Sequence, residues 1–478
     1  MSATTQTQPP SSFEAYNLTP LDWVNLPIHV PVAFVFTPAS IPAGVEALER
    51  GISRLVTQLP FLAGNVILNQ GNGGVVRPPS GKLLEENPMI RTEVHLKSIS
   101  VLHKPNYGFN DGISSDSFLP IPISLQSQNN SPVIRFCINV MTDGLILCAS
   151  FHHATMDGLG VMNVIRMIGM CCASHDMPRL PVSSHTEASV RSRVLNITTS
   201  GSFMDMESYG RHHWSHLHLT SCELQFPSKR IRQLGKVCNG VLSQLIPEKQ
   251  ASQDDTRKVN ELSTSDVFSA LLWLCGTRAR SGARSRSASS PYTTDTTRLS
   301  VAVNIRGVLK PPIPLSYLGN AMVVASDTHA RDEMRASGTT TATSIDKDEL
   351  RLLANLAFKI RHIVQGVDDQ YVRQVMQHIK QSQDRQDASF YFPETFVTNT
   401  RLLNLHRWEF GPELGKVVNF EHLKTRINGL CSILPRCQGN AEDPPWKVRV
   451  VLEPLAMERL REDGLIRWAA GEELPCKL

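Results

Sequence analysis

Short apolar runs and longer amphipathic segments alternate along this chain. Apolar runs bounded by turn residues predict strands, and apolar residues spaced three and four apart predict helices. By this criterion, strands are expected at residues 32–36, 65–68, 92–96, 133–140, 145–153, 299–305 and 447–452. Helices are expected at residues 43–57, 161–170, 231–245, 263–279, 346–365, 368–384 and 457–463. The two kinds of element mix irregularly in both halves, which predicts α/β layers.

The stretch at residues 144–170 carries the most informative pattern. An Asp143-Gly144 pair predicts a hairpin turn, because both positions tolerate a positive φ. The apolar run that follows is typical of a buried strand, and it ends in His152-His153. From residue 161 onward, apolar residues recur at helical spacing and would form the buried face of a helix.

The two histidines at the end of this strand must point in opposite directions. Side chains alternate along a strand, so His153 shares a face with Phe151 and His152 takes the other. A rigid strand could therefore present His153 to a cleft as a base, with Asp157 holding the loop or the imidazole. Gly158 would let the chain bend tightly before the helix. The alternative is a buried, hydrogen-bonded histidine pair, with Asp157 as a helix N-cap.

Length and composition narrow the class of protein. A chain of 478 residues exceeds one ordinary core, so two large domains are expected. Apolar residues make up 41% and charged residues 19%, which is an ordinary globular balance. The net charge of +4 is too small to indicate binding to nucleic acid or to a membrane surface.

The cysteines and the sequences of the two termini predict where in the cell the protein is located. The ten cysteines are scattered and form no C-x-x-C pair, which predicts buried thiols in a reducing compartment. The sequence has no basic-then-apolar leader and no apolar run long enough to span a bilayer. A soluble, cytoplasmic protein is expected. A peroxisomal location is the alternative, because the C-terminal Cys476-Lys477-Leu478 resembles the Ser-Lys-Leu address.

Shifts in composition predict the domain boundaries. Residues 1–17 begin with a Ser/Thr/Gln/Pro-rich tract and are expected to be disordered. A first domain at residues 18–190 would carry the histidine pair, and a second would span residues 226–478. The crossover linker between them, at residues 191–225, falls largely in a polar tract at about residues 174–218 that we expect to be poor in helix.

The motif His153-x-x-x-Asp157-Gly158 at the end of an apolar strand carries a family resemblance. In this motif the chain resembles a fungal member of the BAHD acyltransferases, within the wider class related to chloramphenicol acetyltransferase. Weaker matches follow in the family's order at residues 55–66, 262–280 and 303–321. Together these segments span most of the chain.

One signature departs from the family's pattern. The family's Asp-Phe-Gly-Trp-Gly-like run appears at residues 408–416 as WEFGPELGK, with Glu in place of Asp and no Trp after the first Gly. The usual Ser-Trp pair is also missing from residues 396–400. In the family the first of these loops supports the donor channel away from the chemistry. The departure therefore bears on the donor site more than on the reaction.

The resemblance implies a two-domain chloramphenicol acetyltransferase-like α/β fold with mixed sheets, helices packed on them, and an active-site channel at the interface. Acetyl-CoA or another acyl-CoA would enter from one mouth, and a small-molecule alcohol from the other. A thioester requires neither a metal nor a permanently bound cofactor. His153 alone would take the hydroxyl proton and return it to the CoA sulfur. Nothing in the sequence demands a partner subunit, so a monomer is expected.

The resemblance also assigns residues around the base. Asp157 could orient the imidazole as in a catalytic triad, or it could pair with Arg306 in a bidentate clamp. The family favours the clamp, with Gly158 as further structural support. CoA-binding residues are expected at Ser263, Thr398 and Asn399.

The acceptor is less defined by the sequence. A hydroxyl of a fungal secondary metabolite, such as a terpenoid, alkaloid or polyketide, is expected, and an amine could use the same base. His152 also gives the chain the His-His-x-x-x-Asp-Gly pattern of peptide-synthetase condensation domains, which use carrier-bound donors, but no carrier domain adjoins it. A non-catalytic binding module of the same fold is the remaining alternative.

Overall fold

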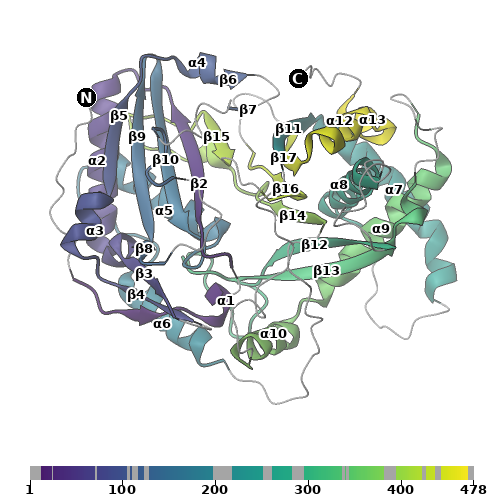
Figure 1. Cartoon of the computed structure of the whole chain (residues 1–478), viewed down its shortest axis with the longest axis horizontal. Helices are drawn as coiled ribbons and strands as arrows, with labels where there is room; N and C mark the ends of the chain where they lie inside the picture. The colour runs from purple at the N-terminus through teal and green to yellow at the C-terminus, as the bar shows by residue number, and fades with distance from the viewer. Residues whose placement is uncertain are drawn as a thin grey trace.

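The protein is described by a computed structural model, shown in Figure 1. The described residues are 12–23, 25–69, 73–104, 108–109, 117–122, 129–197, 218–250, 261–281, 295–335, 340, 344–381, 394–422, 427–436 and 443–471. Within them, one large sheet is drawn in purple to blue in Figure 1, except for its yellow-green edge strand from residues 419–422, and a second is drawn in teal to yellow. The mixed sheets and the helices on them confirm the two-part α/β architecture.

The first large sheet carries the histidine pair on a central strand. Its strands, in spatial order, are β15 (Asn419–His422), β2 (His29–Phe36), β10 (Gly144–His152), β9 (Ile134–Met141) and β5 (Ile90–Val94). Strand β10 is antiparallel to both neighbours, β2 and β9, and every one of its residues is buried. The turn predicted at Asp143-Gly144 connects β9 to β10.

Burial on the two faces of β10 follows the expected alternation. Leu145, Leu147 and Phe151 belong to the core formed with helices α2 (Ile41–Gln58) and α5 (Gly158–Ala173). Ile146 and Cys148 belong to a separate cluster on the opposite face. This alternation fixes the directions in which the two histidines point.

The second large sheet is formed by strands from residue 220 onward. Its strands, in spatial order, are β11 (Thr220–Phe226), β17 (Trp446–Leu452), β16 (Leu430–Ile433), β14 (Thr395–Asn399), β12 (Thr296–Asn304) and β13 (Met322–Ala330). Helix α8 (Thr264–Ser281) is buried almost all round, as an apolar helix must be. It packs against α7 (Ser228–Gln250), α9 (Lys347–Gly366), α12 (Pro454–Glu462) and α13 (Gly464–Ala470).

The two sheets are joined by a strand and by buried charges. Strand β15 comes from the C-terminal part of the sequence, yet it pairs with β2 in the first sheet. From β15, Glu421 forms a buried ion pair with Arg449 on β17 of the second sheet. Arg449 also lies 3.7 Å from Glu223, which pairs with Lys447 at 3.1 Å.

Smaller elements complete the fold. A four-stranded sheet contains β1 (Tyr16–Asn17), β4 (Gly74–Arg77), β3 (Asn65–Leu68) and β8 (Ser131–Pro132), and β6 (His103–Lys104) pairs with β7 (Gly108–Phe109). The other α-helices are α1 (Pro20–Trp23), α3 (Gly81–Glu86), α4 (Ile99–Leu102), α6 (Ser184–Leu195) and α10 (Asp369–Gln381). Short 3-10 turns lie at Pro60–Ala63, Asp332–Met334 and Leu405–Arg407.

Two expectations about irregular segments are wrong. Residues 12–17 are not disordered, because Tyr16–Asn17 pairs with β4 and the Tyr16 ring lies 4.0 Å from the Arg191 guanidinium. The polar tract after residue 174 contains helix α6, which the low hydropathy concealed. Ser183 caps that helix, and its few buried residues include Val190 and Val194. Residues 1–11 and most of the crossover linker lie outside the described residues.

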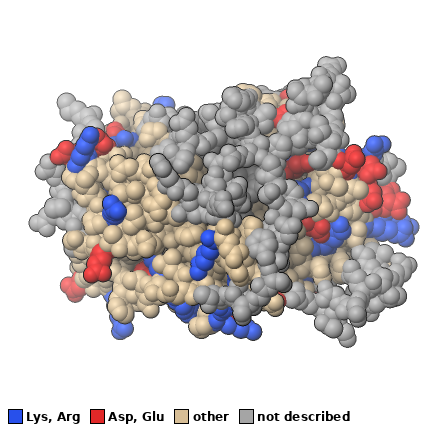
Figure 2. Space-filling model, turned by 60° about the horizontal axis from the view of Figure 1, so that its bottom comes forward, with Lys and Arg blue, Asp and Glu red and all other residues tan. Residues whose placement is uncertain are grey.

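Charges of both signs are mixed on the described surface that Figure 2 shows. Lys and Arg are interspersed there with Asp and Glu. Among the described helices, none combines the length and the apolar content needed to cross a bilayer. The C-terminal tripeptide lies outside the described residues, so the peroxisomal address stays a prediction.

Candidate active site

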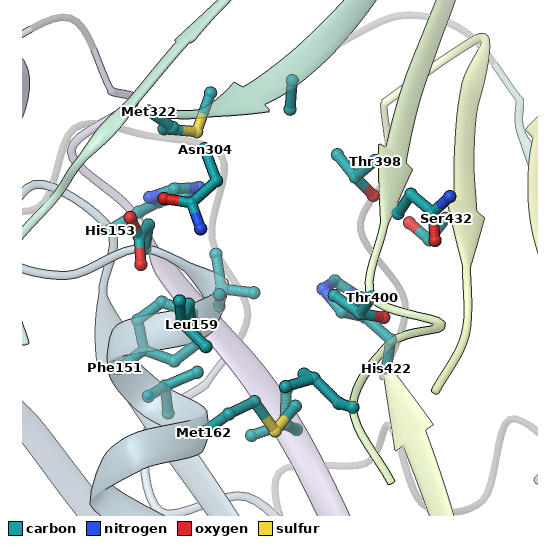
Figure 3. A pocket seen from close by; sticks show the side chains of 18 of the residues that line it. Phe151, His153, Leu159, Met162, Asn304, Met322, Thr398, Thr400, His422 and Ser432 are labelled. Atoms are coloured by element: carbon teal, nitrogen blue, oxygen red, sulfur yellow. The ribbon is translucent and has the colours of Figure 1, made fainter. Parts of the chain in front are cut away.

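A cavity of about 400 Å³ lies between the two large sheets, as Figure 3 shows. One wall, which we call the first wall, is formed by β2, β10 with its following loop, and α5, and carries Phe151, His153, Leu159 and Met162. The opposite or second wall is formed by β14, β15 and β16 with the turn after β14, and carries Thr398, Thr400, His422 and Ser432.

His153 faces this cavity from the end of β10. Its backbone N–H donates to the carbonyl of Ile28 at 2.9 Å, which continues the strand pairing by one residue. The side chain is half-buried, and its Nδ1 is buried beside the backbone of His153 and Met156, with no side-chain partner among the described residues. Nε2 is therefore the ring nitrogen available to the cavity.

Burial sets the charge of this imidazole. Removal from water lowers the pKa of His153 below the ordinary value of 6.5, and this effect outweighs the opposing effects of nearby backbone groups and of Asp157. The ring is therefore neutral at neutral pH. A neutral imidazole is the form that can accept a proton.

His152 points away from the cavity, as the strand alternation predicted. It is fully buried, and its ring lies edge-on to that of His29, with centroids 5.2 Å apart. His29 donates from Nε2 to the carbonyl of Pro132 at 2.8 Å, and burial lowers its pKa to about 4. The alternative of a buried structural histidine therefore describes His152 and His29, whereas His153 lines the cavity.

Asp157 is buried and holds the loop that follows His153. Its carboxylate accepts two hydrogen bonds from Arg306, at 2.9 and 3.0 Å. It also accepts from the backbone N–H of Gly160 at 2.8 Å, as the N-cap of α5, and from that of Ala321 at 2.9 Å. The carboxylate is thus both a helix cap and one side of a bidentate clamp, and these four bonds occupy both of its oxygens.

Arg306 connects this loop to the second sheet. It is almost completely buried and follows β12 by two residues. Besides the clamp, its Nη2 donates to the carbonyls of Tyr317 and Gly319, and its Nη1 lies 3.3 Å from Asn304 Oδ1. The predicted ion pair between Asp157 and Arg306 is therefore present, and it crosses between the two halves of the protein.

Glycine is required at position 160 and not at position 158, where it was expected. Gly158 begins α5 without a positive φ, and a Cβ added there would meet nothing within 4 Å. A Cβ on Gly160 would instead lie 2.1 Å from the carbonyl oxygen of Leu318. The close packing of this helix start against residue 318 therefore requires glycine at position 160, and Gly158 has no such role.

The expected CoA-binding residues divide into two groups. Thr398 and Asn399 line the second wall of the cavity. Ser263 does not line it, because it caps α8: its N–H and Oγ each donate to Asp266 Oδ2 at 2.7 Å. Asn399 donates to Ser265 Oγ at 3.1 Å, so the start of α8 supports this wall from behind.

Other cavity residues were not singled out from the sequence. Asn304 and Met322 enter the cavity from the paired ends of β12 and β13, on the same side as His153 in Figure 3. His422 and Ser432 lie on short strands without a strong pattern of their own. Only Asn304 carried a signal, because it lies two residues before Arg306 in a segment that matches the family.

The altered signature at residues 408–416 lies away from the chemistry. Its Phe410 is buried against Phe36, with ring centroids 4.8 Å apart, and none of the nine residues lines the cavity. Gly411 and Gly415 have φ values of +85° and +70°, which favour glycine. The run keeps the two glycines that its turn needs.

Comparison with known proteins agrees with this geometry. The profile of the family described as "Transferase family" matches residues 4–465. The communesin N16 acyltransferase cnsK of Penicillium expansum is 32% identical, over 96% of this chain and 98% of its own length. The fumigaclavine B O-acetyltransferase easN of Aspergillus fumigatus is 24% identical, over 96% and 98% of the two chains.

Solved structures share the fold. TRI101 of F. graminearum, solved with coenzyme A and deoxynivalenol, superposes with a TM-score of 0.69 at 17% identity, over 95% of this chain and 98% of that chain. Vinorine synthase superposes with a TM-score of 0.63 at 14% identity, over 98% and 99%. These likenesses show the fold.

The two mixed sheets with a cavity between them have the fold of TRI101 and vinorine synthase, and the family profile and the relative at 32% identity show that this chain is an acyltransferase. The chain belongs to the Transferase family. The predicted membership of the BAHD-type acyltransferases is confirmed.

Proposed function

We propose that the protein transfers an acetyl group from acetyl-CoA to a hydroxyl of a fungal secondary metabolite, with His153 as general base. The observation that carries this proposal is the placement of a neutral imidazole on the wall of a cavity between the two sheets. Curated relatives that match almost the whole chain are named acyltransferases of fungal metabolites. TRI101 was solved with coenzyme A bound, which supports acyl-CoA as donor.

The reaction needs one proton relay. Nε2 of His153 takes the proton of the acceptor hydroxyl as its oxygen attacks the thioester carbonyl carbon. The carbon–sulfur bond then breaks, and the same imidazolium returns the proton to the CoA sulfur. The proton thus passes from the acceptor hydroxyl to the CoA thiol, and His153 is the one protein group that the relay requires.

The negative charge that develops on the carbonyl oxygen needs a hydrogen-bond donor. Asn304 suits this role, because its Oδ1 already accepts from the Arg306 N–H at 3.1 Å and lies 3.3 Å from Nη1. Its Nδ2 is thus the amide atom left to face the cavity, on the side of His153 (Figure 3). Thr398 and Asn399, on the opposite wall, are placed to contact the CoA arm.

An amine acceptor is a second candidate, favoured by one observation. The relative at 32% identity is named an N16 acyltransferase, whereas the one at 24% is named an O-acetyltransferase. The same base would take the amine proton after attack. A carrier-bound donor gains no support from these comparisons, because TRI101 was solved with coenzyme A.

The test is direct. Purified protein is incubated with acetyl-CoA and matched pairs of alcohols and amines built on the same indole, terpenoid or polyketide skeleton, and released thiol and product mass are followed. We expect acceptor-dependent thiol release with a product 42 Da heavier, a value set by the acetyl group alone and about the same for both acceptor types. Thiol release without an acetylated product, or no release with any acceptor, would contradict the proposal.

A further inference from the structure

Residues 317–321, just before β13, are held by buried charged side chains at every position. Arg306 donates to the carbonyls of Tyr317 at 3.0 Å and Gly319 at 2.9 Å. The three N–H groups between and after them donate to carboxylates: Leu318 to Glu187 at 2.8 Å, Asn320 to Asp22 at 3.3 Å, and Ala321 to Asp157 at 2.9 Å. Five consecutive backbone groups are thus fixed by four side chains that belong to other parts of the chain.

The side chain of Asn320 extends this rigid segment toward the base. Its Nδ2 donates to the backbone carbonyl of His153 at 3.0 Å and to Asp22 Oδ1 at 2.8 Å. Asp22 is itself fixed, because its Oδ2 accepts from the N–H and hydroxyl of Thr19 at 2.7 and 2.8 Å. Asn320, Asp22 and Thr19 are all fully buried.

The His153 ring is oriented through the backbone and not by a side chain. No side chain bonds its Nδ1 among the described residues, and the carboxylate of Asp157 is fully engaged by Arg306 and two backbone groups. The backbone of His153 is held at its N–H by Ile28 and at its carbonyl by Asn320. A shift of the carbonyl would turn the ring within the cavity.

We propose that Asn320, with its amide oriented by Asp22, is a positioning residue that fixes the direction of the His153 imidazole. Asn320 touches neither substrate nor the reacting atoms; it acts through the backbone of the base. The proposal rests on the proposed role of His153. Loss of this contact should lower kcat, while the affinity for acetyl-CoA, whose predicted contacts lie on the opposite wall, should change little.

The experiment compares full-length Asn320→Ala and Asn320→Asp with wild type. The second variant keeps the shape of the side chain but places a carboxylate oxygen, which cannot donate, toward the His153 carbonyl and Asp22. With an acceptor that the wild type acetylates, we expect kcat to fall about a hundredfold in both, with KM for acetyl-CoA within about threefold, because misplacing a catalytic group by about 1 Å has an effect of this size.

A matched control separates positioning from general loss of stability. Asn139 is also a fully buried asparagine, whose Nδ2 donates to the carbonyls of Phe118 and Ile146 far from His153. Asn139→Ala should destabilise the fold to a similar degree and leave kcat within about threefold, since it removes comparable hydrogen bonds.

Chemical modification of His153 provides a second measurement that does not depend on turnover. The pH dependence of carbethoxylation of His153 by diethyl pyrocarbonate, read by peptide mass spectrometry, should shift toward that of an exposed histidine in Asn320→Ala and stay at the wild-type value in Asn139→Ala. Wild-type kcat in either folded Asn320 variant, or equal losses in Asn320→Ala and Asn139→Ala, would overturn the proposal. Undiminished turnover in His153→Ala would instead overturn the role of the base.

Discussion

The two walls of the cavity are built in different ways. The first wall comes largely from one stretch, in which β10, the His153 loop and α5 follow one another. The second wall is assembled from β14, β15 and β16, three short strands, two of which belong to one sheet and one to the other. The first wall can therefore be predicted from local pattern, and the second depends on how distant segments meet.

The walls also differ in chemistry. Around His153 the first wall is largely apolar, with Phe151, Leu159 and Met162 along the cavity and Asn304 as a polar group on the same side. The second presents hydroxyl groups and an imidazole. Burial among largely apolar side chains lowers the pKa of His153 and keeps the imidazole neutral. Most of the polar groups that can orient substrates lie on the opposite wall.

The largest effect is expected at the clamp behind the first wall. Asp157→Ala leaves the Arg306 guanidinium buried without its carboxylate, and removing one partner of a buried pair costs about 3–5 kcal/mol of folding free energy. We expect a large drop in the urea midpoint and in soluble yield, together with loss of turnover. A fully stable Asp157→Ala enzyme with only a kinetic defect would show that the clamp does not hold the fold.

A surface pair provides the matched control for the clamp. Arg232 and Asp443 also form a two-bond pair, at 2.6 and 2.7 Å, but both side chains are about half exposed. Asp443→Ala should leave the urea midpoint within experimental error, because water already solvates both charges. A loss as large as that of Asp157→Ala would show that burial is not what separates the two pairs.

The buried histidine behind the first wall predicts sensitivity to acid. His29 has a pKa of about 4 in the folded protein, against 6.5 when exposed, so the unfolded chain binds more protons between these values. Stability should fall by about 3 kcal/mol as the pH drops from 6.5 to 4. His29→Gln, which can still donate to Pro132, should flatten this part of the curve in urea denaturation; an unchanged slope would exclude His29 as its source.

Two substitutions distinguish what the two sides of the cavity do. Asn304→Asp keeps the oxygen that accepts from Arg306 and removes the N–H that we assign to the oxyanion, so kcat should fall about a hundredfold. Thr398→Val should mainly raise KM for acetyl-CoA, by about threefold to tenfold, because it removes a binding contact. The reverse pattern in steady-state kinetics would move the oxyanion donor to the second wall.

The sequence predicted the first wall for a physical reason. The alternation of β10 and the capping role of an Asp before a helix are local rules, so the directions of His152 and His153 followed from spacing alone. The Arg306 partner came from the family resemblance, and no local rule could have placed it 149 residues from Asp157.

The second wall could not be predicted in the same way. Strand β15 has only four residues, and its partner β2 is nearly 400 positions earlier, so its place in the first sheet leaves no periodic signal. His422 on that strand was missed for this reason. Ser263 lies outside the cavity lining because it caps α8, so its contact with CoA stays a prediction. The division at residues 190 and 226 and the monomeric state stay predictions.

The most direct measurement compares the two histidines of the cavity. His153→Ala and His422→Ala are purified, their folding is checked by urea denaturation, and their single-turnover rates of acetyl transfer are measured across pH. His153→Ala should lose about 10²- to 10⁴-fold in rate and the acid limb of its pH profile, which in the wild type lies below pH 6.5 because burial lowers the pKa of His153. His422→Ala should lose far less and keep that limb. Wild-type turnover in a folded His153→Ala enzyme would contradict the account.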